Sequence, residues 1–210
     1  IVKGSNINTG INPVAELVYG GHTSRILCYF DHNKIKNMVD NGIFPNIDKL
    51  KHTLHITNAG SLDFTQLHTK EYSSIGSGIK KRATSFDVLF FLIPQEWDRG
   101  KGFDYSKTAF NENFYDTKNT HNASRLVSTD GSNWFQAKNG YKWKEEGVYS
   151  TDTLSLEYDK FSSEEGSNIV IGRQHFDIGN ENISLDITDI FNKFITGDLE
   201  NYGIGIAFTP

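Results

Sequence analysis

Apolar and polar residues alternate along much of the chain, and this pattern predicts a protein built mainly from β-strands. Residues 86–93 form an almost continuous apolar run, which is typical of a central strand that is buried on both faces. The expected strands are Val14–Tyr19, Ser24–Asp31, His52–Asn58, Ser85–Ile93, Leu154–Tyr158, Asn168–Phe176, Ile183–Ile187 and Gly203–Phe208.

The last of these segments has two unlike faces. Alternation places Ile204, Ile206 and Phe208 on one face, whereas glycine and alanine leave the other face nearly bare. A strand that lacks side chains on one face allows a neighbouring group to approach its backbone closely. We therefore expect a helix or a bulky side chain to cover the bare face.

Two short helices are expected between the strands. The first starts near Asp31, which can serve as its N-cap, and stops at Gly42. The second starts at Thr188 or Asp189 and stops at Gly197. About eight strands with two helical connections predict a mainly β fold, an antiparallel two-sheet β-sandwich of jelly-roll type.

Residues 97–149 differ from the rest of the chain because their apolar positions follow no regular period. The segment contains all three Trp and 11 of the 27 Phe, Tyr and Trp residues. A segment of this length without a regular pattern is usually a functional loop or an interaction arm. We therefore treat it as a long aromatic-rich insert in the sandwich.

Size and composition narrow the class of protein. At 210 residues the chain can bury one good core, so we expect a single domain over residues 1–210. A net charge of −5 argues against a nucleic-acid partner, which requires clustered Lys and Arg. No apolar run is long enough for a membrane span, so no membrane partner is expected. Both ends of the sequence look truncated, so we expect the chain to be a segment of a longer protein.

Four stretches of sequence resemble one known family. They are Ser24-Arg25-Ile26-Leu27 with Phe30-Asp31, then Leu50 to Ile56, then Val88 to Ile93 with Glu96-Trp97, and finally Ser184 to Thr188 with Asn201 to Ile204. Together they are similar to the DNRLRE-type jelly-roll domains of bacterial surface proteins and of tailed-bacteriophage structural proteins. The stretch from Glu96 to Tyr105 is most similar to virion proteins of phages that infect gut Bacteroidetes, including the crAss-like group.

The resemblance implies a capsid, collar, tail or fibre component that is located in the virion and is assembled in the bacterial host cytoplasm. The implied partners are other virion proteins or copies of the chain itself. The family supplies no catalytic residues, and we expect no enzyme activity. The long aromatic insert departs from the family pattern and leaves the partner open.

The five aromatic residues Trp97, Tyr105, Trp134, Tyr141 and Trp143 are the main binding candidates. They could anchor a protein interface, because Trp and Tyr are enriched at interface hot spots. They could instead stack on sugar rings, which would make the chain a carbohydrate-binding module that attaches a larger protein to host glycans. A third interpretation is that they only cap one end of the sandwich.

Arg25, Asp31 and Asp186 are expected to have structural roles. Arg25 lies within a predicted strand at the edge of an apolar run, where an unpaired charge would be costly. We expect its guanidinium to form a hydrogen-bonded pair with the carboxylate of Asp31 or of Asp186.

Asp98 and Asp104 are the best metal candidates, because acidic residues six apart in a Gly-rich stretch could place oxygens around Ca²⁺. The stretch lacks the intervening ligands of a calcium loop, so a plain turn is the preferred interpretation and no cofactor is expected. Two carboxylates among Glu145, Glu146, Glu96 and Asp98 could form the acid pair of a glycan-cleaving enzyme. This enzyme hypothesis is the weakest of the three functions, after the assembly module and the glycan-binding module.

Overall fold

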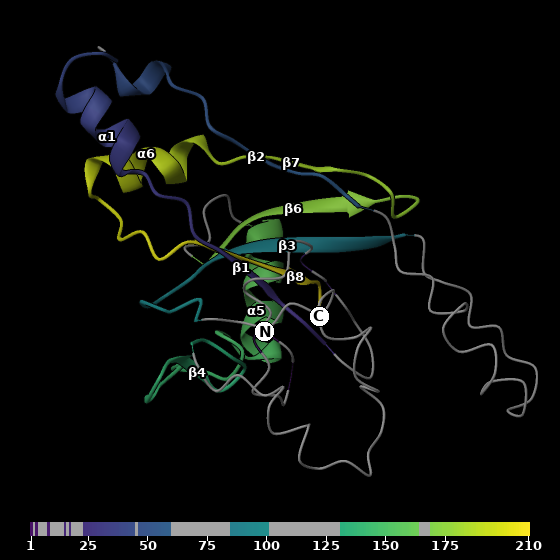
Figure 1. The fold of residues 1–210 in the computed structure, drawn as a ribbon. Coiled ribbons are helices and arrows are strands. Elements are labelled where there is room, and N and C mark those ends of the chain that lie inside the picture. Colours follow the sequence, from purple (N-terminus) through teal and green to yellow (C-terminus); the bar gives the residue numbers. More distant parts are fainter. Residues whose placement is uncertain are drawn as a thin grey trace, which may run out of the picture.

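Antiparallel β-sheet forms the centre of the computed structural model, with helices above and below it (Figure 1). The structure describes residues 1, 3, 8, 15, 17, 23–44, 46–59, 85–100, 131–163 and 169–210. Its elements are β1 (Ile26–Cys28), α1 (Asn33–Asp40), the 3-10 helix η1 (Ile47–Lys49), β2 (Thr53–Ile56), β3 (Phe86–Leu92), β4 (Gln136–Lys138), β5 (Tyr141–Lys142), α5 (Thr151–Ser163), β6 (Val170–Phe176), β7 (Ile183–Asp186), α6 (Thr188–Thr196) and β8 (Ile204–Phe208).

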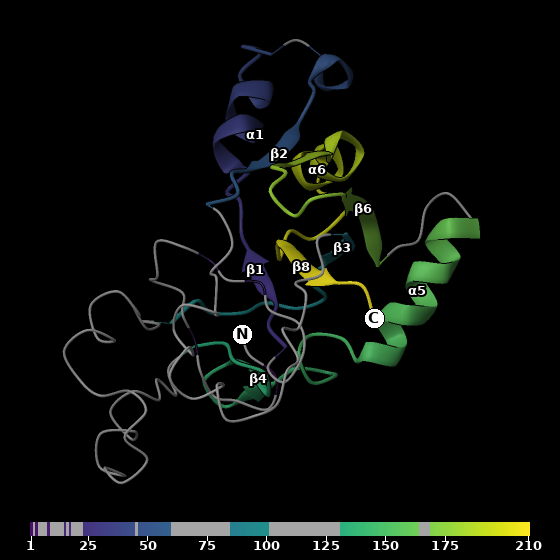
Figure 2. The same ribbon diagram turned by 90° about the vertical axis from the view of Figure 1, so that its right-hand side faces the viewer.

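The strands form three antiparallel groups. The largest is a four-stranded sheet in the order β1-β8-β3-β6, and β2-β7 and β4-β5 are two-stranded. The β2-β7 pair and α6 lie above the large sheet in Figure 1, whereas α5 and β4 lie below it. Figure 2 shows the same separation from the side, with α5 away from α1 and α6. The fold is mainly β and is compatible with a β-sandwich.

Strand β3 is buried on both faces, as its apolar run predicts. Leu89, Phe90 and Phe91 have no exposed surface. Phe90 points into a core shared with β2, β7 and α6, whereas Leu89 and Phe91 point into a second core shared with α5 and the segment 131–150. The large sheet therefore separates two hydrophobic cores.

The bare face of β8 is covered by an aromatic ring, which confirms the expectation of a bulky neighbour. Gly205 lies opposite Phe91 in the β3–β8 register. A Cβ atom placed on Gly205 would lie 2.2 Å from the Phe91 ring, so only glycine fits at this position.

One expected strand is wrong, because residues 154–158 belong to helix α5. The apolar residues Leu154, Leu156 and Tyr158 fit a period of two, but Leu156 is 63% exposed and Leu154 is buried. The helix buries Leu154 on one face, and the Ser150 hydroxyl accepts a hydrogen bond from the N–H of Thr153 at its start. The described part of the chain therefore has three short α-helices. The expected strand Val14–Tyr19 lies largely outside the described residues.

The other two helices begin and end close to the expected residues. Gly42 follows α1 with φ of 70° and Gly197 follows α6 with φ of 83°, the left-handed conformation that often ends a helix. Among the residues that the structure describes, no helix is both long and apolar enough to cross a membrane.

Candidate functional site

Arg25 is buried at the junction between β1 and the aromatic insert. Its Nη1 donates hydrogen bonds to the carbonyl oxygens of Gly147, at 2.6 Å, and Tyr149, at 2.5 Å. The guanidinium also lies 4.9 Å from the centre of the Trp134 ring. Burial lowers the pKa of Arg25 to about 10, and the nearby carboxylate of Glu145 opposes this shift. The structural role expected for Arg25 fits these contacts, but its partners are backbone carbonyls and not an aspartate.

Asp31 and Asp186 each stand just before a helix and away from Arg25. The Asp31 carboxylate accepts a hydrogen bond from the N–H of Asn33 at the start of α1, at 3.0 Å. The Asp186 carboxylate accepts one from the N–H of Thr188 at the start of α6, at 2.9 Å. A carboxylate is favourable at this end of a helix because the first N–H groups lack partners within the helix. The hydrogen bond from the Asn33 N–H lowers the pKa of Asp31, and hydrogen bonds from the hydroxyl and then the N–H of Thr188 lower the pKa of Asp186.

Two of the five aromatic candidates lie in the protein interior. Trp134 is 4% exposed and Trp143 is 5% exposed, and the Trp143 indole N–H donates to the carbonyl oxygen of Asn133. Neither ring presents a face on which a sugar could stack. The interpretation that the insert caps one end of the sandwich therefore fits these two residues.

The remaining aromatic candidates differ in exposure. The indole N–H of Trp97 donates to the carbonyl oxygen of Tyr202 at 2.7 Å, and the ring packs against the second core. Tyr141 is 64% exposed, and the Lys138 ammonium lies 5.1 Å from its ring centre. Tyr105 lies outside the described residues, so Tyr141 is the described candidate with the most accessible ring.

The acidic candidates have local hydrogen-bond partners. The Asp98 carboxylate accepts a hydrogen bond from the N–H of Gly100, which is typical of a turn, whereas Asp104 lies outside the described residues. Within the described ranges, no three His, Cys, Asp or Glu side chains come together in a way that could hold a metal ion. The calcium hypothesis for Asp98 and Asp104 stays a prediction.

Glu145 and Glu96 also have polar partners, local in the sequence for Glu145 and distant for Glu96. The Glu145 carboxylate accepts hydrogen bonds from the N–H of Ser150 and the hydroxyl of Thr153, at the start of α5. These bonds lower the pKa of Glu145, with the Ser150 N–H contributing most. Glu96 forms an ion pair with Lys138 at 2.5 Å.

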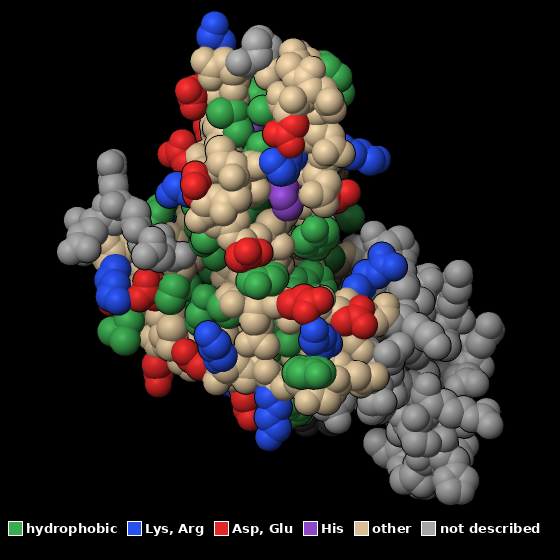
Figure 3. All heavy atoms as spheres, turned by 90° about the vertical axis from the view of Figure 1, so that its left-hand side faces the viewer, with side chains coloured by type: hydrophobic (Ala, Val, Ile, Leu, Met, Phe, Trp, Pro, Cys, Tyr) green, Lys and Arg blue, Asp and Glu red, His purple; other side chains and the backbone are tan. Residues whose placement is uncertain are grey.

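Two exposed apolar side chains lie at the C-terminal end of α1. Met38 is 39% exposed and Ile43 is 61% exposed, and we call these two residues the α1 patch. Helix α1 has no fully buried residue, although Ile35 and Val39 pack partly against the first core. Figure 3 shows hydrophobic side chains that reach the surface on this side of the molecule, between scattered charged groups.

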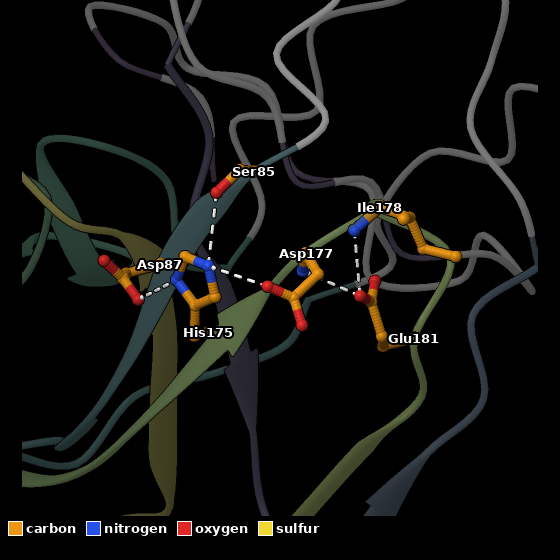
Figure 4. Close-up of polar contacts among 6 residues, drawn as sticks. All are labelled: Ser85, Asp87, His175, Asp177, Ile178 and Glu181. Carbon is orange, nitrogen blue, oxygen red and sulfur yellow. Dashed lines mark hydrogen bonds and ion pairs between the residues drawn. The ribbon is translucent and has the colours of Figure 1, made fainter.

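A second group of side chains is polar and lies where β3 and β6 pair. The ring of His175 has its Nδ1 2.8 Å from the Asp87 Oδ1 and its Nε2 3.1 Å from the Ser85 hydroxyl oxygen (Figure 4). The Asp177 carboxylate lies 3.4 Å from the same Nε2. The hydrogen bond to Asp87 raises the pKa of His175 above its ordinary value, and the charges of Asp87, Asp177 and Glu181 act in the same direction.

The sequence interpretation did not single out this polar group. Ser85 and Asp87 are two residues apart in a strand, so a shared face could be predicted. Asp87 and His175 are 88 residues apart, and only the β3–β6 register places them opposite each other.

Comparisons with known proteins return no similar protein. No family model matches the chain, and no curated protein or solved structure matches it. The similarity to DNRLRE-type domains therefore stays a prediction from the sequence.

Proposed function

We propose that this chain is an assembly module of jelly-roll type that acts through protein–protein contacts, as a structural component of a virion. The strand pairing supports the jelly-roll part of the proposal. β1 pairs with β8, β2 with β7, β3 with β6 and β4 with β5, all antiparallel. A long hairpin that is rolled up on itself gives this order of pairs. Jelly rolls are common in viral capsids, and the virion assignment depends on that analogy and on the sequence resemblance.

The observation that carries the assembly role is the α1 patch. A short amphipathic helix normally buries its apolar stripe, but Met38 and Ile43 remain exposed at the end of α1. The N–H of Ile43 donates to the carbonyl oxygen of Met38 at 2.9 Å, which holds the two residues close together. Met side chains are enriched at protein interfaces. The patch therefore has the composition of an interface, and we assign it to contacts between copies of the chain.

The alternative of glycan binding has less structural support. Two of its five candidate rings, Trp134 and Trp143, are buried in the second core. A glycan platform would therefore depend mainly on Tyr141, and Lys138 already lies over the ring of that residue. Binding to a glycan array that is lost in Tyr141→Ala would favour this alternative over assembly.

We predict that Ile43→Lys weakens self-association of the chain. A lysine at this position would place a hydrated charge in the apolar contact between two copies. We expect the free energy of association to become less favourable by at least about 1.4 kcal/mol, which corresponds to a tenfold weaker association. Sedimentation equilibrium over a wide concentration range measures the association constant directly.

Ile178→Lys provides the matched control. Ile178 is also 61% exposed, but it lies in the turn between β6 and β7, so this variant should associate like the unchanged chain. Self-association that is equally strong in Ile43→Lys and in the control would contradict the assignment of the patch. An unchanged chain that stays monomeric at every concentration would contradict it as well.

A further inference from the structure

Ser85, Asp87 and His175 are held on two neighbouring strands of the large sheet. Ser85 immediately precedes β3, and Asp87 is two residues further on, so both side chains leave the same face. His175 lies directly opposite Asp87 in β6. The N–H of Thr209, just after β8, donates to the Asp87 carbonyl oxygen and so holds β3 from its other side. The relative positions of the three side chains are therefore set by paired strands.

The atoms of this group lie in the order carboxylate, Nδ1, Nε2 and hydroxyl. This is the arrangement in which a histidine activates a hydroxyl. The Asp87 carboxylate lies 2.8 Å from Nδ1, so the proton of the neutral ring is favoured on Nδ1. The lone pair of Nε2 then faces the Ser85 hydroxyl at 3.1 Å. A nucleophile, a base within hydrogen-bond reach and a third group that orients the base are the components of nucleophilic catalysis.

We propose that Ser85 is an activated nucleophile that accepts acyl groups from small esters, with His175 as the general base and Asp87 as the residue that positions it. In the first step a bond forms between the Ser85 hydroxyl oxygen and the ester carbonyl carbon. The proton passes to Nε2 of His175 and then to the leaving alkoxide, as the bond from the carbonyl carbon to that alkoxide breaks. Water attacks the acylated serine by the same proton route, which releases the acid and restores Ser85.

The surroundings allow this chemistry. Ser85 is exposed and the His175 side chain is 50% exposed, so a small ester can reach the hydroxyl from solvent. The Asp177 carboxylate, 3.4 Å from Nε2, stabilises the imidazolium that forms when His175 takes the proton. The Glu181 carboxylate accepts hydrogen bonds from the N–H groups of Asp177 and Ile178 and so fixes the turn that carries Asp177.

Reaction with an alkyl fluorophosphonate, followed by intact-mass and peptide mass spectrometry, tests the proposal. We expect one phosphonyl group on Ser85 and none in Ser85→Ala. Removal of the base in His175→Gln should slow labelling by about 100-fold, the lower end of the range for general-base catalysis. The same variants should show parallel losses in the hydrolysis of p-nitrophenyl acetate.

The pH profile separates a chemical role of Asp87 from a structural one. Protonated His175 cannot accept a proton, so labelling should rise with pH through the pKa of His175, which Asp87 holds above the ordinary value. In Asp87→Asn the midpoint of this rise should move to lower pH. A purely structural role of Asp87 would leave the midpoint unchanged and would overturn that assignment.

The matched control is His55→Gln. His55 is an exposed strand histidine that lies opposite Ser184 in the β2–β7 register, so it is a histidine and serine pair outside the proposed group. This variant should be labelled at the same rate as the unchanged chain. Labelling of serines other than Ser85, or equal rates in His175→Gln and His55→Gln, would overturn the proposal. Unchanged circular dichroism of the exposed-site variants would show that the losses do not come from unfolding.

Discussion

Replacement of Arg25 by methionine is expected to lower the free energy of unfolding by about 2–4 kcal/mol, because each buried carbonyl group that loses its donor costs about 1–3 kcal/mol. Methionine preserves much of the volume but donates no hydrogen bond. The carbonyl groups of Gly147 and Tyr149 would lose their donor, and the Trp134 ring would lose the guanidinium beside it. Urea denaturation followed by Trp fluorescence measures the change, because Trp134 reports on this region.

Arg173→Met is the matched control for this experiment. The Arg173 guanidinium lies 4.5 Å from the Tyr158 ring centre and 5.0 Å from that of Phe161, and the residue is only partly buried. Its loss should cost about 1 kcal/mol, as for a partly exposed cation–π contact. A smaller effect at Arg25 than at Arg173 would show that Arg25 does not connect the insert to the sheet.

Replacement of Phe90 by alanine should destabilise the protein by about 3–5 kcal/mol, the usual cost of removing a large side chain from a core. Phe90 has no exposed surface and points into the first core, between the large sheet and α6. The cavity can close only partly, because β3 is paired on both sides. Urea denaturation of the unchanged chain and of Phe90→Ala gives the difference in unfolding free energy. The comparison uses the same dependence of the unfolding free energy on urea concentration for both proteins.

Phe86→Ala is the control on the same strand and the same face. The Phe86 ring stacks on Phe176 at 4.8 Å, but the residue is only partly buried at the end of β3. Its replacement should cost about 1–2 kcal/mol, because less apolar surface becomes exposed to water. Equal losses of unfolding free energy in Phe86→Ala and Phe90→Ala would contradict the deeper burial of Phe90.

Much of the sheet could be predicted from local pattern. The apolar run 86–93 indicates a strand buried on both faces, and the alternation before Phe208 indicates a strand with one bare face. Helix α5 was missed because the spacing of Leu154, Leu156 and Tyr158 fits a strand as well as a helix. Ser150, which caps this helix, was the available signal for it.

The candidate sites were harder to predict than the strands. Trp134 and Trp143 looked like contact residues because composition does not distinguish a buried Trp from an exposed one. Arg25 was expected beside an aspartate, but folding brings the carbonyl groups of Gly147 and Tyr149 to it, more than 120 residues along the chain.

The amino-acid sequence by itself determined most strands of the large sheet and which face of β8 needs a close neighbour, but not β4, β5 or the helix α5. These properties follow from the local spacing of apolar side chains. Apolar side chains become buried away from water in whatever tertiary structure the chain adopts. Only the tertiary structure decided the partners of Arg25, the burial of the two Trp rings and the meeting of Ser85, Asp87 and His175. Each of these depends on the register and packing of segments far apart in the chain, and no local pattern encodes that approach.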